Sequence, residues 1–282
     1  MTNSYLNIIT FLLTTLFYYL ALKPALPYSL YKDKDAYKSF ITNSYMYLAI
    51  YVLIVIIIQF MVNSSIISSN CGGNITENMG MAGVLTFLPW ILIFGVLVLI
   101  LTVYPGFKTA FSDVVGYYYI SSSANKILTE LLVNKDVEKK LLEDPNMTPE
   151  KKIAMESAAD TIIKICGNTS ILINQIVPSN FDQYLSLLRP LMKDRYQVDS
   201  PTTTQIQNEL FELVVTRDNV GEAMWYMYTG LLLTSIVQLK ITSRGCSSNP
   251  STMEANYQKF VEADKKAAAE KAKSDKTYTM TN

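Results

Sequence analysis

The sequence predicts an all-α membrane protein with four, and at least three, transmembrane helices, a small helical extramembrane domain and a helical C-terminal tail. Half of the 282 residues are apolar and only 17% are charged, whereas a soluble domain usually carries about a quarter of charged residues. Three uncharged apolar runs are long enough to cross a hydrocarbon core of about 30 Å. Only seven charged residues lie among the first 107, so most of the charge follows the third run.

The three runs occupy residues 5–22, 45–62 and 84–103, and they place three transmembrane helices in residues 1–107. Core helices of a soluble protein are the alternative, but such helices normally carry a polar stripe. The first run lacks the basic start and the small-residue cleavage site of a signal peptide, so we expect a retained anchor. Aromatic residues, which favour the headgroup level, mark the ends of the runs: Tyr18, Tyr19, Tyr45, Tyr47, Trp90 and Tyr104.

A fourth uncharged run covers residues 223–239 and is near the lower length limit for a span. We predict a fourth transmembrane helix there; a buried or interfacial helix is the alternative. Four spans would place residues 23–44 and 104–222 on one face and residues 63–83 on the other. Residues 23–44 hold four lysines, whereas residues 63–83 hold no Lys or Arg. The positive-inside rule therefore makes the face with residues 104–222 cytosolic, although basic residues after the fourth run oppose this orientation.

Two of the three cysteines follow predicted spans in Gly- and Ser-rich segments. Four spans put Cys71 and Cys246 on the same face. We predict a disulfide between them, conditional on the fourth span and on an oxidising compartment; two unpaired thiols are the alternative. Cys166 lies in an apolar helical segment and is predicted to be a buried small hydrophobe.

The segment 108–222 is predicted to be a helical extramembrane domain. Thr148-Pro149-Glu150 is a strong helix start, because Thr can cap, Pro suits the first helical position and Glu favours the positive end of the dipole. Ser179 is predicted to cap a second helix that ends at Pro190. Ser200-Pro201 opens a third helix, whose buried face is predicted from its helical spacing: Ile206, Leu210, Leu213 and Val214.

The tail, residues 240–282, is rich in Ala, Lys and Glu and has high helix propensity around residues 253–276. Its large apolar residues, Tyr257, Phe260 and Val261, lie only in the first half. We expect a solvated helix or a disordered tail. The alternative is a lysine-rich helix that docks on a partner or an anionic surface.

The sequence contains little that could carry out chemistry. It has no histidine, which removes the commonest general base and histidine metal sites. It also has no phosphate-binding loop and no zinc-spaced cysteine pair. The spans hold no charged residue, which argues against pumps and carriers, whereas a passive pore lined by hydroxyl side chains stays open. Two acidic groups, Glu143-Asp144 and the set Glu209, Glu212, Asp218 and Glu222, are interpreted as solvated rather than metal-binding.

We therefore predict no enzyme activity, no catalytic residue, no cofactor, no metal and no small-molecule substrate. The 24 basic and 24 acidic residues balance, so nucleic acid is not an expected partner. The expected partners are the lipid bilayer and capsid or other membrane proteins.

The start of the chain resembles a known group of proteins. Tyr5–Pro24, with its Tyr18-Tyr19 pair and its end at Lys23-Pro24, is similar to the N-termini of small membrane proteins of large double-stranded DNA viruses. This resemblance covers about 20 residues of hydrophobic pattern and carries over no functional residue. It implies a minor capsid protein in the virion's internal membrane, which derives from host endoplasmic reticulum during assembly. Such a protein would link the bilayer to the capsid shell.

Three functions remain open from the sequence. The first is a viral membrane-anchored minor capsid or scaffold protein. The second is a membrane adaptor without a capsid role. The third is a passive channel or transport subunit.

Overall fold

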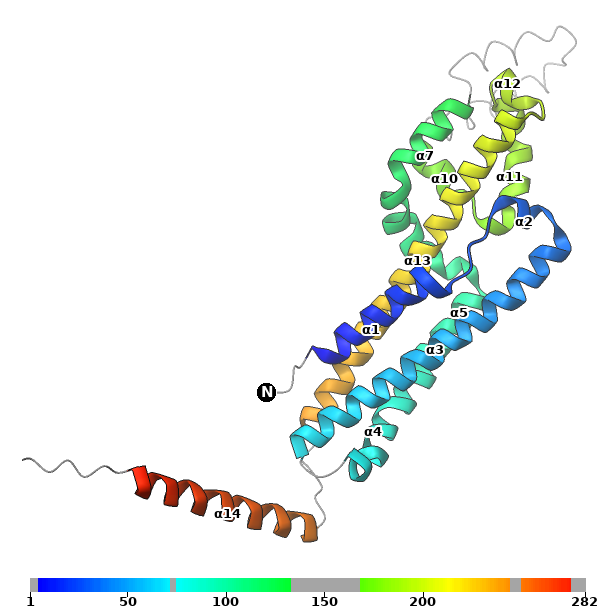
Figure 1. The fold of residues 1–282 in the computed structure, drawn as a ribbon. Helices are drawn as coiled ribbons and strands as arrows, with labels where there is room; N and C mark the ends of the chain where they lie inside the picture. The colour runs from blue at the N-terminus through cyan, green and yellow to red at the C-terminus, as the bar shows by residue number, and fades with distance from the viewer. Residues whose placement is uncertain (1–4, 72–74, 133–167, 244–249, 275–282) are drawn as a thin grey trace, which may run out of the picture.

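The computed structural model describes residues 5–71, 75–132, 168–243 and 250–274. Within these ranges the chain is helical throughout, apart from one isolated antiparallel bridge between Leu132 and Met192 and short connections. This confirms the predicted all-α class. Figure 1 shows a bundle of long helices and, beyond one end of it, a group of shorter helices, with α13 (Pro201–Ser243) running through both.

Four helical rods form the bundle, and most exceed the predicted spans. Their bounds are α1 (Leu6–Phe17) with its π-helical continuation η1 (Tyr18–Leu22), α3 (Lys34–Cys71), the series α4 (Ile75–Pro89), η2 (Trp90–Gly95) and α5 (Val96–Val103), and the second half of α13. The expected loops 23–44 and 63–83 are therefore largely helical. Polar residues at both ends of α3 simply continue its helix, because nothing in them breaks it.

Among the described residues, two helices are long and apolar enough to cross a membrane by length and composition, Lys34–Cys71 and Asn78–Val103. Leu6–Leu22 is apolar but shorter. α13 is long enough but is not among the helices that are also sufficiently apolar. The expected number of three or four spans is thus not confirmed. The predicted fourth span is the second half of α13 rather than a separate helix. Its hydropathy is diluted by tyrosines, threonines and Gln238, and no helix breaker separates it from the residues before 223.

The shorter helices pack around the first half of α13. They are η3 (Pro105–Lys108), α6 (Thr109–Phe111), η4 (Ser112–Gly116), α7 (Tyr117–Leu131), α10 (Thr169–Gln175), η5 (Pro178–Asn180), α11 (Phe181–Leu188), η6 (Arg189–Leu191) and α12 (Asp194–Gln197). The predicted start of α13 is confirmed, since the Ser200 hydroxyl accepts a hydrogen bond from the Thr203 amide at 3.1 Å. Ile206, Leu210 and Val214 are buried. The prediction that Ser179 caps the second helix is wrong, because Ser179 lies inside η5 and Asn180 precedes α11. The expected helix after Thr148 lies outside the described residues.

A segment from the first predicted loop belongs to this second core. Tyr28, in α2 (Tyr28–Lys32), packs its ring against Phe181 and Phe211 at 5.3 Å in each case. Its hydroxyl donates to Asp182 at 3.0 Å. Residues 23–44 and the shorter helices therefore lie at the same end of the bundle, which agrees with the placement of both segments on one face.

Candidate functional site

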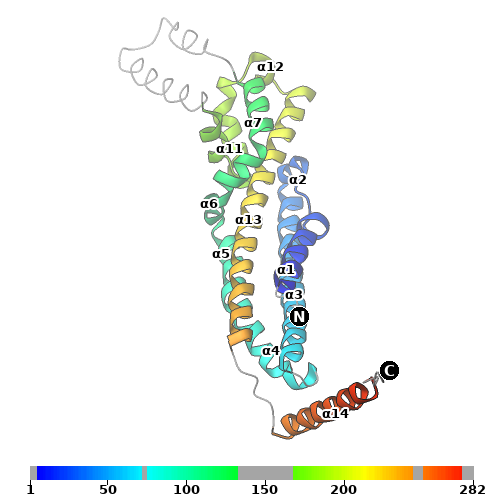
Figure 2. The same ribbon diagram turned by 90° about the vertical axis from the view of Figure 1, so that its left-hand side faces the viewer.

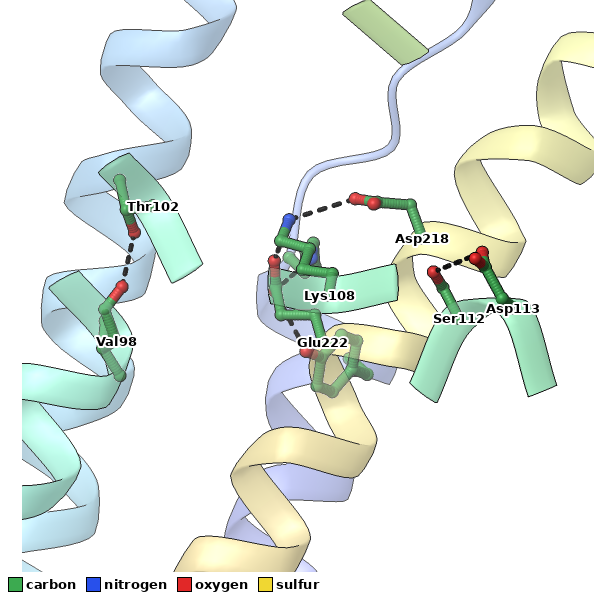
Figure 3. A network of polar contacts seen from close by, with 9 residues as sticks. Val98, Thr102, Lys108, Ser112, Asp113, Asp218 and Glu222 are labelled. Atoms are coloured by element: carbon green, nitrogen blue, oxygen red, sulfur yellow. Dashed lines mark hydrogen bonds and ion pairs between the residues drawn. The ribbon is translucent and has the colours of Figure 1, made fainter. Parts of the chain in front are cut away.

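The most distinctive polar feature is a buried ionic cluster where the bundle meets the shorter helices, which we call the junction cluster (Lys23, Lys108, Asp218, Glu222). Lys23 follows η1, Lys108 ends η3, and both acids lie on α13. Lys23 Nζ lies 2.5 Å and Lys108 Nζ 2.7 Å from the two oxygens of Glu222. Lys108 Nζ also lies 3.0 Å from Asp218 Oδ2, as Figure 3 shows. The cluster thus joins three segments that are far apart in the sequence.

The electrostatics of the junction cluster favour the charged forms of Glu222 and Lys108. Burial alone would raise the pKa of Glu222, but Lys23 and Lys108 outweigh it and lower that pKa to about 2. Burial would lower the pKa of Lys108, yet Glu222 and Asp218 raise it above its usual value. Two cations and two anions leave no net charge. The short distances among these four charged groups therefore fit a clamp that fixes three segments of the chain relative to one another.

Arg217, the residue before Asp218, forms a second connection at the same level. It is completely buried. Its guanidinium donates to the backbone carbonyls of Ile173 and, at 2.9 Å, Ile176, and to the Asn174 side chain at 3.2 Å. These carbonyls lie at the C-terminal end of α10, where a cation is favoured. Arg217 therefore caps α10 and holds it against α13.

Glycines bring η4 and α13 into backbone contact beside these charges. A Cβ at Gly221 would lie 2.6 Å from Ser112 Cβ, and a Cβ at Gly116 would lie 2.6 Å from the Arg217 carbonyl oxygen. Any side chain at either position would push the two elements apart. The polar clamp and the glycine contact together tie α13 to the first turns after the third predicted span.

An uncharged polar group, which we call the amide layer, lies near the opposite end of the bundle. Asn63 on α3 accepts from Asn7 Nδ2 of α1 at 2.7 Å and donates to Thr86 Oγ1 of α4 at 2.8 Å. Gln59 Nε2 donates to the Asn7 carbonyl at 3.0 Å. Asn7 Nδ2 lies 3.5 Å from Gln238 Oε1 of α13. Three rods thus meet in buried hydrogen bonds, and the half-buried Gln238 adds a longer contact from the fourth.

The amide layer yields a stability prediction. Replacing Asn63→Leu removes the bonds to Asn7 and Thr86 and leaves their polar atoms buried without this partner. We expect a loss of about 1–2 kcal/mol, the range found for hydrogen bonds between helices in membranes, measured as a lower unfolding midpoint in mild detergent. Thr102→Val is the matched control, because the Thr102 hydroxyl bonds to the Val98 carbonyl of its own helix (Figure 3). Equal midpoints for the two variants would contradict the prediction.

The interior between the two polar levels is filled by aromatic rings. Phe11, Tyr51, Trp90, Phe94 and Tyr226 come from all four rods and are at most 1% exposed. Their rings contact one another, with centroids 5.3 Å apart for Phe11 and Trp90 and 5.6 Å for Phe94 and Tyr226. At this level aromatic rings, rather than a line of hydroxyl side chains, occupy the interior between the described rods.

The structure describes some of the residues predicted from the sequence to matter, and others lie outside the described ranges. Cys71 ends α3 and packs against the apolar cluster that contains Ile241 of α13, whereas Cys246, Cys166 and Glu143-Asp144 lie outside the described residues. The acidic set divides: Glu209 and Glu212 lie on the outer side of α13, while Asp218 and Glu222 belong to the junction cluster. No group of three or more potential metal ligands occurs among the described residues.

Sequence reasoning missed the junction cluster and the amide layer. A signal for the first was present, because Lys23, Lys108 and Glu222 each flank the end of an apolar run on the same predicted face. No family model, no curated protein and no solved structure matches the chain. The viral resemblance of Tyr5–Pro24 stays a prediction.

Proposed function

We propose that the chain is a non-enzymatic integral membrane structural protein whose four rods all span the bilayer. One observation carries this proposal: the bundle is apolar outside and carries amides and hydroxyls inside. Large apolar side chains are at least 40% exposed at helical spacing on every rod, whereas Asn7, Gln59 and Asn63 are buried. The exposed set includes Ile9, Leu13, Leu16 and Leu20; Leu53, Ile57 and Met61; Val84, Leu88, Leu92 and Leu99; and Leu232, Ile236 and Leu239. Lipid suits such a surface, and water does not.

The second half of α13 is included for a geometric reason. Its inner face contributes Tyr226 and Leu233 to the same core as α1, α3 and η2. Its outer face presents Leu232, Ile236 and Leu239, which are 47%, 51% and 65% exposed. A helix that shares both the core and the apolar exterior of its neighbours belongs at the same depth.

We further propose a role for the helices beyond the junction cluster. They lie at the same end of the bundle as the lysine-rich segment that begins at Lys23, which supports a cytosolic position. The viral resemblance supports a minor capsid or scaffold protein, with the bilayer holding the bundle and this helical part facing the capsid shell. The virion's internal membrane, formed from host endoplasmic reticulum, would be its location.

Fractionation of virions tests this function. The protein should co-purify with virions, resist salt washing and dissolve in detergent, because an integral protein is held by lipid rather than by charge. Recovery only from host endoplasmic reticulum, in a defined host complex, would replace the capsid role by that of an adaptor. Solute or ion flux through liposomes that contain the purified chain would instead support a channel.

A disulfide between Cys71 and Cys246 is proposed with the same topology. Cys71 packs against the cluster that contains Ile241, so the end of α13 lies close to the end of α3. α13 ends at Ser243, three positions before Cys246. Non-reducing peptide mapping of protein alkylated at harvest should yield a linked Cys71–Cys246 peptide that separates on reduction. Free alkylation of both residues in the untreated protein would contradict the pairing and leave the four rods unaffected.

A further inference from the structure

The tail helix α14 (Pro250–Ser274) has exposed side chains in its middle part. From Glu254 to Glu270 the described side chains are exposed, with Val261 partly so. Tyr257 and Phe260 are each 69% exposed. Two large rings on an isolated helix therefore lack the cover that side chains of this kind normally have.

These apolar residues share one face of α14. Tyr257, Phe260 and Val261 follow the i, i+3, i+4 spacing that places side chains together. Lys259 and Lys266 are one heptad apart, and the helical repeat of 3.6 residues puts them on the opposite side. α14 thus carries an aromatic face, which ends at Asp264, opposite a charged face that holds Lys259, Glu262 and Lys266.

The position of α14 relates this aromatic face to the bundle. Figures 1 and 2 both show α14 beyond the end of the bundle where α13 stops, extending to one side of the bundle and inclined to its axis. Pro250 follows Ser243, the last residue of α13, by seven positions. The helix therefore lies at the level where the four rods would leave the bilayer.

We propose that the face formed by Tyr257, Phe260 and Val261 lies in the headgroup layer of the bilayer, on the side where α13 ends. This inference rests on the proposed four-span function. Tyrosine and phenylalanine on an amphipathic helix suit the boundary between headgroups and acyl chains. Because α14 is inclined to the bundle axis rather than a continuation of it, the helix can lie along the membrane surface with Lys259 and Lys266 toward water. The tail thus extends the membrane contact of the bundle.

Photo-crosslinking in the full chain tests this placement. The photoreactive residue p-benzoylphenylalanine replaces Phe260, Lys266 or Ile236 in separate proteins, each reconstituted in phosphatidylcholine vesicles with a minority of anionic lipid. Lipid adducts should form from position 260 several-fold more than from position 266, on the opposite face of α14. Lipid adducts from position 236, on the outer face of α13, show whether the second half of α13 contacts the bilayer. Tyr257→Asp should reduce the adduct at position 260, because it places a charge in the contacting face.

The outcomes separate the two proposals. Adducts at position 236 with none at position 260 would overturn the tail placement and leave the spans intact. Absence of adducts at both positions would overturn the proposed function as well. Equal adducts at positions 260 and 266, or crosslinks from position 260 to protein, would show that the aromatic face does not select lipid, which overturns the inference.

Discussion

Replacing Glu222→Gln is expected to lower the stability of the folded protein by about 3 kcal/mol or more. The change removes one negative charge from a buried group. Lys108 keeps its contact with Asp218, whereas Lys23 loses its ion-pair partner in the cluster; the two lysine side chains are 13% and 19% exposed. Breaking a buried ion pair on one side typically costs about 3–5 kcal/mol, because the remaining charge stays desolvated. In a chain of this size this corresponds to a midpoint lower by at least about 6 °C, measured by thermal unfolding in mild detergent.

Glu212→Gln is the matched control for this variant. Glu212 lies on the same helix, outside the junction cluster, and undergoes the same chemical change. The free energy of unfolding of this variant should therefore stay within about 0.5 kcal/mol of that of the parent protein. If the Glu222 and Glu212 variants had the same unfolding midpoint, the junction cluster would not contribute to stability and the clamp interpretation would be wrong.

The pH dependence of this difference gives an independent check on the same carboxylate. The pKa of Glu222 is lowered from 4.5 to about 2 in the folded state. A group whose pKa is depressed on folding stabilises the fold above its unfolded pKa and loses that contribution as the pH falls through the folded value. The midpoint difference between parent and variant should therefore be constant above pH 4.5 and shrink between pH 4.5 and about 2. A difference that grew on acidification would contradict the lowered pKa.

The parts of the fold that the sequence could predict depend on local patterns. Uncharged runs marked the apolar parts of α1, α3 and α5, because a single helix must satisfy its own backbone in an apolar environment. The start of α13 at Pro201 was equally local, since a serine cap and a proline at the first helical position act within one turn. Such features require no knowledge of which helices are neighbours.

The junction cluster depended on information that no local pattern contains. Lys23 pairs with Glu222 across 199 positions, and Lys108 pairs with Asp218 across 110. Each charge looks like an ordinary flank of an apolar run. Only the packing of α1, η3 and α13 at one level converts these flanks into a buried network. The same applies to the amide layer, where Asn63 resembles a loop residue until α3 continues past it to Cys71.

The continuity of α13 was missed for a related reason. The change in hydropathy near residue 223 suggested a boundary, yet helix propensity does not change there. Gly221 and Gly230, which would mark breaks in a soluble helix, are instead places of close contact. In helices that pack in lipid, small residues let neighbouring helices approach, so glycine indicates an interface as readily as an end.

Gly230→Ala is expected to be strongly destabilising for a change of one methyl group. A Cβ at this position would lie 2.0 Å from Phe11 Cζ on α1. The ring cannot swing away, because Phe11 is fully buried and is held between Trp90 and Phe94, with centroids at 5.3 and 5.9 Å. We expect a cost of about 1–3 kcal/mol from overpacking, read as a lower unfolding midpoint. Gly80→Ala is the control, since nothing lies within 4 Å of its Cβ position and the helix gains propensity.

A compensating change shows whether the cost arises at this contact. Phe11→Leu shortens the side chain that the added methyl group would meet, so the double variant should be more stable than the sum of the two single losses by at least about 0.5 kcal/mol. The same substitution combined with Gly80→Ala should be additive, because the two positions share no contact. Additivity in the Gly230 pair, or a Gly230 variant as stable as the Gly80 variant, would mean that α1 and α13 do not pack as closely as this core requires. The second half of α13 would then lose its main argument for a place among the spans.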